Sequence, residues 1–248
     1  MLKPLLLFFT DNSHIKINFS LRWRCGKLSK SVIEAFTLAE VLLALSTIGI
    51  LAALTIPSLI QQIEFKQNKV AFKKAYSDIA AATQRIMNDN GGSLKGVFAN
   101  ENGLRDKYLN YLIYTKKCDS TVSYGNCWHA VGKFYWLNGA ETGWTGEPGA
   151  ILNNGALLNF SFSDTNCANT SYYGAANCGF IAIDVNGFKA PNTFGKDIFE
   201  LYIQDFRIRP DGIPKDATPG FGTCINGDQD TNNYGLSCAV KVLENENY

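Results

Sequence analysis

The sequence predicts an α+β protein in which a long N-terminal helix packs on an antiparallel β-sheet. Three observations lead to this prediction. Residues 41–60 form a run of twenty uncharged, mostly apolar residues, residues 61–90 continue with an amphipathic helical pattern, and residues 91–248 hold short strand-like segments separated by turns. A long helix followed by several strands is typical of α+β folds, in which the sheet covers the apolar face of the helix.

The first half of the helix, residues 36–60, has the length and composition of a membrane span. About 20 helical residues cross a hydrocarbon core ~30 Å thick, and no charge follows Glu40 until Glu64. The run is too long for the apolar core of a secretory signal peptide, which has about 7–15 residues. Because a carboxylate at the bilayer centre costs at least about 2.5–3.5 kcal/mol, a lone acid at the mouth of the span indicates a specific partner for Glu40.

The second half, residues 61–90, is amphipathic. Its stripe of residues, apolar or buried in character apart from Lys69, alternates steps of four and three, which is the period of a helix with one buried face. The stripe consists of Phe65, Lys69, Phe72, Tyr76, Ile79, Thr83 and Ile86. Residues 88–92 read Asn-Asp-Asn-Gly-Gly, and glycine is suited to the left-handed position that follows a helix, so we expect the helix to end there.

The remaining chain, residues 91–248, is predicted to be a disulfide-rich globular β domain. Asn154-Gly155 between two apolar runs predicts a hairpin. Residues 104–114 fit a short helix or an extended segment equally well. The expected strands are residues 132–137, 150–152, 156–162, 179–185, 198–203, 206–209 and 237–243.

Six cysteines follow the apolar run, and Cys25 precedes it. The spacings between neighbouring pairs are too long for typical zinc ligands, which favours disulfides over zinc and an oxidising compartment over cytosol. Six cysteines allow fifteen pairings. Each neighbouring pair brackets a turn-rich segment, so we expect sequential pairing. The expected bridges are Cys118–Cys127, Cys167–Cys178 and Cys224–Cys238.

The residues around the start of the apolar run read Ala-Phe-Thr-Leu-Ala-Glu from Ala35 to Glu40. This segment resembles the prepilin signal of type IV pilins and type II secretion pseudopilins. The resemblance implies that residues 1–35 are a leader, that prepilin peptidase cuts between Ala35 and Phe36, and that the new amine of Phe36 is methylated. The family usually has glycine where this chain has Ala35. Glu40 and Pro57 match the acid and the proline that the family uses in assembly.

The same resemblance implies a structural role. The chain would be a subunit of a pilus or pseudopilus with the pilin-like fold, a long N-terminal helix laid on an antiparallel sheet. Its partners would be membrane lipid before assembly, other copies or related subunits, prepilin peptidase and the inner-membrane assembly platform. It would cross the bacterial inner membrane once, with its C-terminal domain in the periplasm, and reach the cell surface when assembled. No cofactor would be required.

Basic residues do not settle the orientation of the span. Four lysines or arginines flank the apolar run on each side, so the positive-inside rule gives a tie. The cysteines break it, because disulfides belong outside the reducing cytosol. We therefore expect the leader inside and the C-terminal domain outside.

A segment rich in Asp and Asn, residues 184–197, offers a candidate metal site. Asp184, Asn186, Asn192 and Asp197 supply the hard oxygens that calcium prefers. The resemblance allows calcium here because major pseudopilins hold calcium in a loop near their C-terminal end. The alternative, which we favour, is that these side chains only form turns.

The sequence offers little sign of catalysis or of nucleic-acid binding. It lacks a Gly-x-Ser-x-Gly nucleophile elbow and a Walker-type phosphate loop, and His129 is the only histidine after residue 35. We expect no enzyme activity and a packed or surface role for His129. Residues 36–248 carry 17 basic and 20 acidic residues, so no broad basic surface is expected. The alternative function is a membrane-tethered surface protein that binds glycan or DNA through aromatic residues in 124–144.

Overall fold

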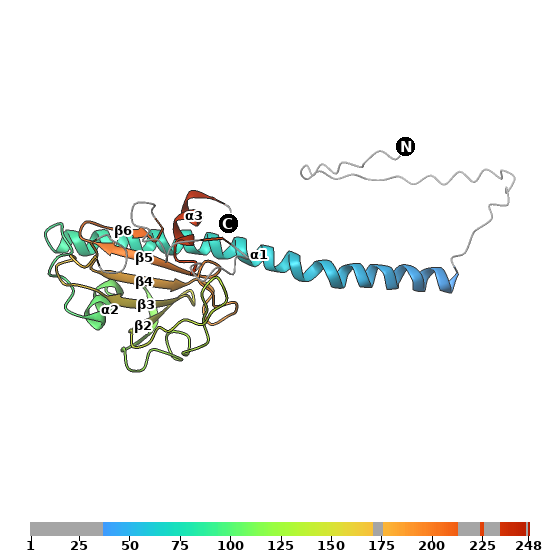
Figure 1. Ribbon diagram of the computed structural model, residues 1–248, viewed down its shortest axis with the longest axis horizontal. Helices are drawn as coiled ribbons and strands as arrows, with labels where there is room; N and C mark the ends of the chain where they lie inside the picture. Colours follow the sequence, from blue (N-terminus) through green and yellow to red (C-terminus); the bar gives the residue numbers. More distant parts are fainter. Residues whose placement is uncertain (1–36, 171–175, 213–223, 226–233, 247) are drawn as a thin grey trace, which may run out of the picture. The chain divides into compact units, whose positions relative to one another are not determined.

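The computed structural model has an α+β fold, as the sequence predicts (Figure 1). It describes residues 37–170, 176–212, 224–225, 234–246 and 248. The elements are α1 (Leu38–Asp89), α2 (Glu101–Leu109), β1 (Tyr114–Cys118), β2 (Gly149–Leu152), β3 (Leu157–Phe162), β4 (Gly179–Asp184), β5 (Ile198–Gln204), β6 (Arg207–Pro210) and α3 (Cys238–Glu244). By its internal contacts the chain divides into two units, Met1–Leu51 and Ala52–Tyr248.

The first half of α1 exposes its apolar side chains on all sides. Leu43 is 66% exposed and Leu54 is 72% exposed, and almost every residue from Leu38 to Ile63 is classed as exposed. By length and composition, α1 could cross a membrane. Pro57 lies inside the helix, which continues through it to Asp89.

The second half of α1 buries one face against the sheet. Phe72, Ile79, Thr83 and Ile86 are buried, as the stripe predicts. The ring of Phe72 stacks on that of Phe199 in β5 with 4.3 Å between centroids. The helix ends at Asp89, ahead of the two glycines that were expected to stop it.

The sheet is a six-stranded antiparallel meander in the order β1-β2-β3-β4-β5-β6. The predicted hairpin joins β2 to β3. Gly155 has φ +87°, a conformation that glycine adopts freely. The amide of Ala156 donates to Oδ1 of Asn154, and the amide of Gly155 donates to the carbonyl of Leu152. Because the strands follow one another in the sheet in chain order, each connection from β2 to β6 joins strands that are hydrogen-bonded neighbours.

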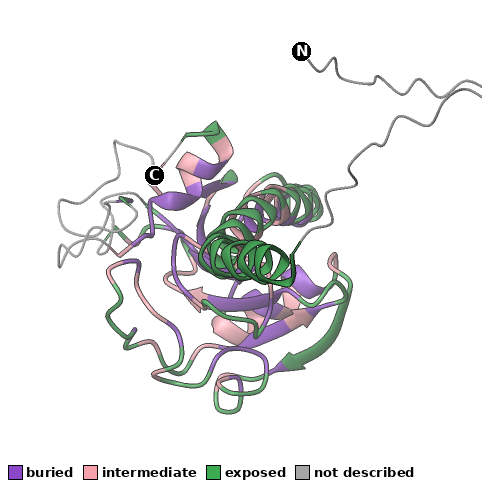
Figure 2. Cartoon of the chain, turned by 90° about the vertical axis from the view of Figure 1, so that its right-hand side faces the viewer, coloured by how far each residue is buried: buried purple, intermediate pink, exposed green. Residues whose placement is uncertain are grey.

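Both faces of the central strands are buried, which Figure 2 shows as purple strands. One face packs on α1 and α2 through residues such as Ile181 and Leu201. The other face is covered by loop residues, including Trp128 and Phe134, which pack with Ala182 and other residues of that face. This second layer explains why β4 is buried at every position instead of alternating.

Two expected strands are wrong. Residues 132–137 form only isolated bridges, because the segment lies between turns at Gly132 and Gly139 and pairs with neighbours one residue at a time. Residues 237–243 instead belong largely to helix α3, whose buried residues Cys238, Ala239 and Val242 follow helical spacing.

Residues 104–114, for which the sequence allowed either a short helix or an extended segment, contain some of each. Most of the segment belongs to α2, whose first turn is capped by Asn100, with Oδ1 accepting from the amide of Gly103 at 2.8 Å. The last residue, Tyr114, begins β1, an edge strand that was not expected. Its exposed Thr115, Lys116 and Lys117 gave it no apolar pattern, although charged side chains are common on edge strands.

Candidate functional site

Thr37 and Glu40 form a capping box at the start of the apolar half of α1. Oε2 of Glu40 accepts hydrogen bonds from the amide and from Oγ1 of Thr37, both at 2.8 Å. The amide of Glu40 donates in return to Oγ1 of Thr37 at 3.2 Å. The spacing Thr-x-x-Glu ahead of an apolar run is a sequence signature of this cap, although only an intermolecular partner was expected for Glu40. Ala35, Phe36 and Cys25 lie outside the described residues.

The structure brings three of the four candidate calcium residues together with His129. Nε2 of His129 lies 2.8 Å from Oδ2 of Asp184. Nδ2 of Asn186 donates to Oδ2 of Asp197 at 3.2 Å, and the amide of Asn186 donates to Oδ1 of Asp184 at 3.0 Å. His129 is buried, and its pairing with Asp184 across 55 residues was not expected.

Asp197 organises the loop between β4 and β5. Its Oδ2 accepts from the amide of Asn192 at 2.8 Å, and its Oδ1 accepts from the amide of Thr193 at 2.7 Å. The side chain of Asn192 points elsewhere and donates to the carbonyl of Lys133. Asp and Asn side chains often hold turns by bonding nearby amides, so these contacts support the turn-forming alternative.

Burial shifts the pKa values of this cluster in opposite directions. Burial lowers the pKa of His129 to about 4, although the charge of Asp197 opposes the shift. Burial, and then the charge of Asp184, raise the pKa of Asp197 to about 7, and burial raises that of Asp184. Folding therefore favours neutral forms of all three groups.

The two shifts have opposite effects on stability. A neutral His129 stabilises the fold above its unfolded pKa of about 6.5, and this stability is lost as pH falls toward 4. A protonated Asp197 stabilises the fold below about pH 4, and this stability is lost as pH rises toward 7. Between pH 4 and 6.5 the two contributions largely cancel.

The two candidate aspartates offer a cation no carboxylate oxygen that is free of a protein contact. All four carboxylate oxygens of Asp184 and Asp197 already face protein nitrogens. Two buried amide oxygens, Oδ1 of Asn186 and of Asn192, have no hydrogen-bond partner. In the described ranges no group of three or more His, Cys, Asp or Glu is placed to hold a metal ion. Calcium binding here stays a prediction. Oδ1 of Asn186, whose side chain contacts Asp197, is the atom that supports it, whereas the side chain of Asn192 is turned toward Lys133.

Comparisons of the chain with protein-family models, with curated proteins and with solved structures find no match. Its functional assignment therefore depends on its own residues.

Three disulfides join neighbouring cysteines, which is the sequential arrangement that loop closure favours. The bridges are Cys118–Cys127, Cys167–Cys178 and Cys224–Cys238, with sequence separations of 9, 11 and 14. All six cysteines are buried. Each bridge closes a loop of the globular part, and short loops of this size are stabilised by about 2.5–3 kcal/mol in the chain-entropy account.

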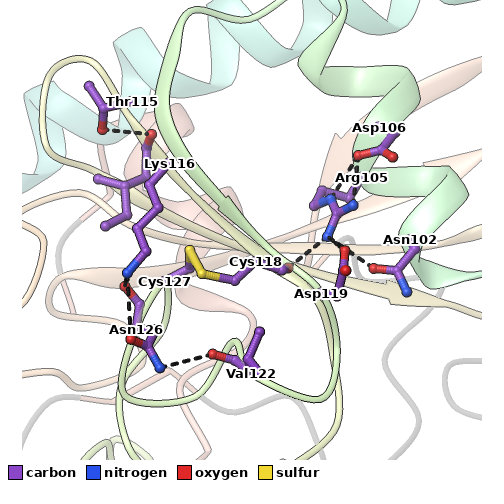
Figure 3. The surroundings of a disulfide bond; sticks show 11 residues. Asn102, Arg105, Asp106, Thr115, Lys116, Cys118, Asp119, Val122, Asn126 and Cys127 are labelled. Carbon is purple, nitrogen blue, oxygen red and sulfur yellow. Dashed lines mark hydrogen bonds and ion pairs between the residues drawn. A yellow bond between two sulfur atoms is a disulfide. The ribbon is translucent and has the colours of Figure 1, made fainter.

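Arg105 is a buried cation that sequence reasoning missed (Figure 3). From α2 its Nη1 donates to the carbonyl of Cys118 at 2.7 Å and to Oδ1 of Asp119 at 2.8 Å. Nη1 also donates to Oδ1 of Asn102, and Nε donates to Oδ1 of Asp106, both at 2.9 Å. Arg105 thereby fastens α2 to the start of the first disulfide loop. Its partners lie up to 14 residues away, so spacing alone gave no signal.

The aromatic residues of 124–144 pack on one another and on the sheet. Trp128 and Phe134 are fully buried, and the rings of Trp136 and Phe194 lie 4.8 Å apart. The six candidates for ligand stacking were Tyr124, Trp128, Phe134, Tyr135, Trp136 and Trp144, and none is exposed. Little aromatic surface is therefore offered to a sugar or a base.

Proposed function

We propose that this chain is a structural subunit of a type IV pilus or type II secretion pseudopilus. It is made as a prepilin, cut between Ala35 and Phe36, N-methylated, and packed into a filament through the first half of α1. Its fold is then the pilin-like variant of α+β, with prepilin peptidase and an inner-membrane assembly platform as partners.

One observation carries the proposal. The two halves of the single helix α1 have different surroundings: beyond residue 63 one face is buried in the domain core, whereas residues 38–63 expose apolar side chains all round. Such a surface needs lipid or other apolar helices. A pilin-type subunit has each of these surroundings in turn: lipid while it is in the membrane, and the apolar helices of other subunits once it is in the filament.

Glu40 supports the filament role over a simple anchor. Among the described residues its carboxylate accepts only from Thr37, its own helix cap. A carboxylate at the edge of an apolar bundle is stabilised when a cation lies beside it. The N-terminal amine of a neighbouring subunit, with an ordinary pKa near 8, supplies that cation.

The disulfides support export of the globular part. Three buried bridges are typical of periplasmic and surface proteins. With the leader inside and residues 64–248 outside, the chain is a single-pass inner-membrane protein before assembly.

The second candidate, a membrane-tethered protein that binds glycan or DNA, has less support. Its aromatic residues are packed in the second layer over the sheet rather than exposed. The apolar half of α1 would anchor such a protein equally well, so the burial of the aromatic residues is the observation that favours the filament subunit over the tethered binding protein.

Incorporation of a Glu40→Ala variant tests the proposal. We expect this variant to be cleaved normally, since its cut site is intact, but to be incorporated poorly into filaments sheared from cells. Asp78→Ala is the matched control, because Asp78 is an exposed acid on the same helix whose only described ion pair is with Lys74. Wild-type incorporation of the Glu40 variant would refute the pairing.

A further inference from the structure

Three lysines lie on one side of α1 just beyond its apolar half. Lys66, Lys69 and Lys73 are spaced by three and four residues, so they share a helix face. They line a hollow of about 390 Å³ between α1 and the end of α3 with the residues that follow it, together with Gln62, Val242 and Glu246. We call this place the lysine hollow.

Two of the three lysines, Lys69 and Lys73, are held in place by neighbouring groups. Nζ of Lys69 lies 4.4 Å from the ring centroids of both Phe65 and Tyr248, which themselves meet edge to face. Nζ of Lys73 donates to Oδ1 of Asn245. Burial, and then the nearby charge of Lys73, lower the pKa of Lys69. Lys69 and Lys73 are thus positioned in the hollow before any ligand binds, and their positive charges repel each other.

No carboxylate neutralises these charges in the described part of the chain. None of the three lysines is in a described ion pair, although Glu246 lies on the wall of the hollow. The nearest acid on α1, Glu64, is engaged by Lys189 at 2.6 Å. An anion of a ligand is therefore the partner that the site lacks.

The level of the hollow on the helix indicates the source of that anion. At about 1.5 Å per residue, the backbones of Lys66 and Lys69 lie roughly 4.5 and 9 Å past Ile63, where the exposed apolar half ends, and that of Lys73 lies farther out, at roughly 15 Å. The polar layer of a bilayer extends roughly 5–8 Å beyond each side of its hydrocarbon core. Lysine side chains near such a boundary reach toward the lipid headgroups.

We propose that the lysine hollow binds the phosphate headgroup of an anionic phospholipid while the subunit waits in the membrane. The inference deepens the proposed function, since it rests on the membrane insertion of α1. The hollow accepts one headgroup, with Lys66 and Lys69 on the phosphate and the apolar half of α1 along the acyl chains. Release of this lipid would accompany extraction into the filament.

Native mass spectrometry of the full chain in mild detergent tests the proposal. The protein is mixed with equal amounts of dioleoyl-phosphatidylglycerol and dioleoyl-phosphatidylcholine, and retained lipids are counted. A lysine at an anionic surface contributes about fivefold in binding, so Lys66 and Lys69 together should give an anionic preference of about 25-fold, to which the more distant Lys73 adds less. Lys66→Gln/Lys69→Gln/Lys73→Gln should abolish it.

Two control variants make the result specific. The Lys-to-Arg triple variant at the same positions keeps the charge and should keep the preference. A triple Gln variant at Lys107, Lys116 and Lys133, elsewhere on the globular part, loses the same charge and should also keep it. Unchanged thermal unfolding shows that each variant is folded.

Three results would overturn the proposal: no preference in the wild type, a preference that survives in the Gln variant of the hollow, or equal loss in the distant variant. A filament defect with unchanged lipid retention would instead place a neighbouring subunit in the hollow. Failure of the pilin assignment is distinguishable, because a chain with an intact leader that still selects phosphatidylglycerol would refute that assignment alone.

Discussion

Replacement of Arg105 by methionine should unfasten the first disulfide loop from α2. The side chain of Arg105 is 2% exposed, and its guanidinium holds acceptors from both elements. Methionine fills a similar apolar volume but donates no hydrogen bond. The change therefore removes the polar contacts while largely keeping the packing.

The expected loss follows from the exposure of each partner. The carboxylates of Asp106 and Asp119 are 46% and 67% exposed, so water screens them and each ion pair contributes at most about 1 kcal/mol. The bond to the carbonyl of Cys118 is buried, and leaving that oxygen unpaired costs about 1–3 kcal/mol. We expect a net destabilisation of about 2–3 kcal/mol. For a unit of this size that lowers Tm by roughly 4–12 °C.

Thermal unfolding of the full chain in mild detergent, followed by circular dichroism, measures the effect. Lys117→Met is the matched control, because Lys117 contacts the same Asp106 at 3.3 Å from an exposed position and should change Tm little. Arg105→Lys should recover only part of the loss, since one ammonium group cannot reach four acceptors. Equal Tm values for Arg105→Met and Lys117→Met would refute this account of Arg105.

Three further predictions concern the pH response, the disulfides and the helix. In His129→Gln the contribution of Asp197 is no longer opposed, so Tm should fall more steeply than in the wild type between pH 5 and 7; parallel profiles would contradict this. Replacing Cys118 and Cys127 by serine should lower the free energy of unfolding by about 2.5 kcal/mol, and a peptide map of the non-reduced wild-type protein should contain a disulfide-linked peptide that joins these two cysteines. In assembled filaments α1 should bend or break within two turns before Pro57; a straight helix in a filament map would refute this.

Local signals in the sequence predicted much of the fold. The stripe from Phe72 to Ile86, the glycine-rich helix end and the turn at Gly155 each depend on a few neighbouring residues, and the structure agrees with them. The sequential disulfides likewise follow from short loops. Periodicity and turn chemistry are properties of the segment itself, so they are legible without the rest of the chain.

Features set by distant partners were missed. The contacts of Arg105 with Cys118 and of His129 with Asp184 join segments whose proximity only the folded chain creates. Residues 237–243 were expected to form a strand, but the structure forms α3 there. A short apolar segment fits either period, and tertiary packing decides between them.

The mass of the mature N-terminus tests the central claim most directly. The chain would be purified from membranes of a host with an active prepilin peptidase and examined by intact-protein and peptide mass spectrometry. The account predicts a chain that begins at Phe36 and carries one N-methyl group. A chain that retains residues 1–35, or one cut after the apolar run, would contradict it.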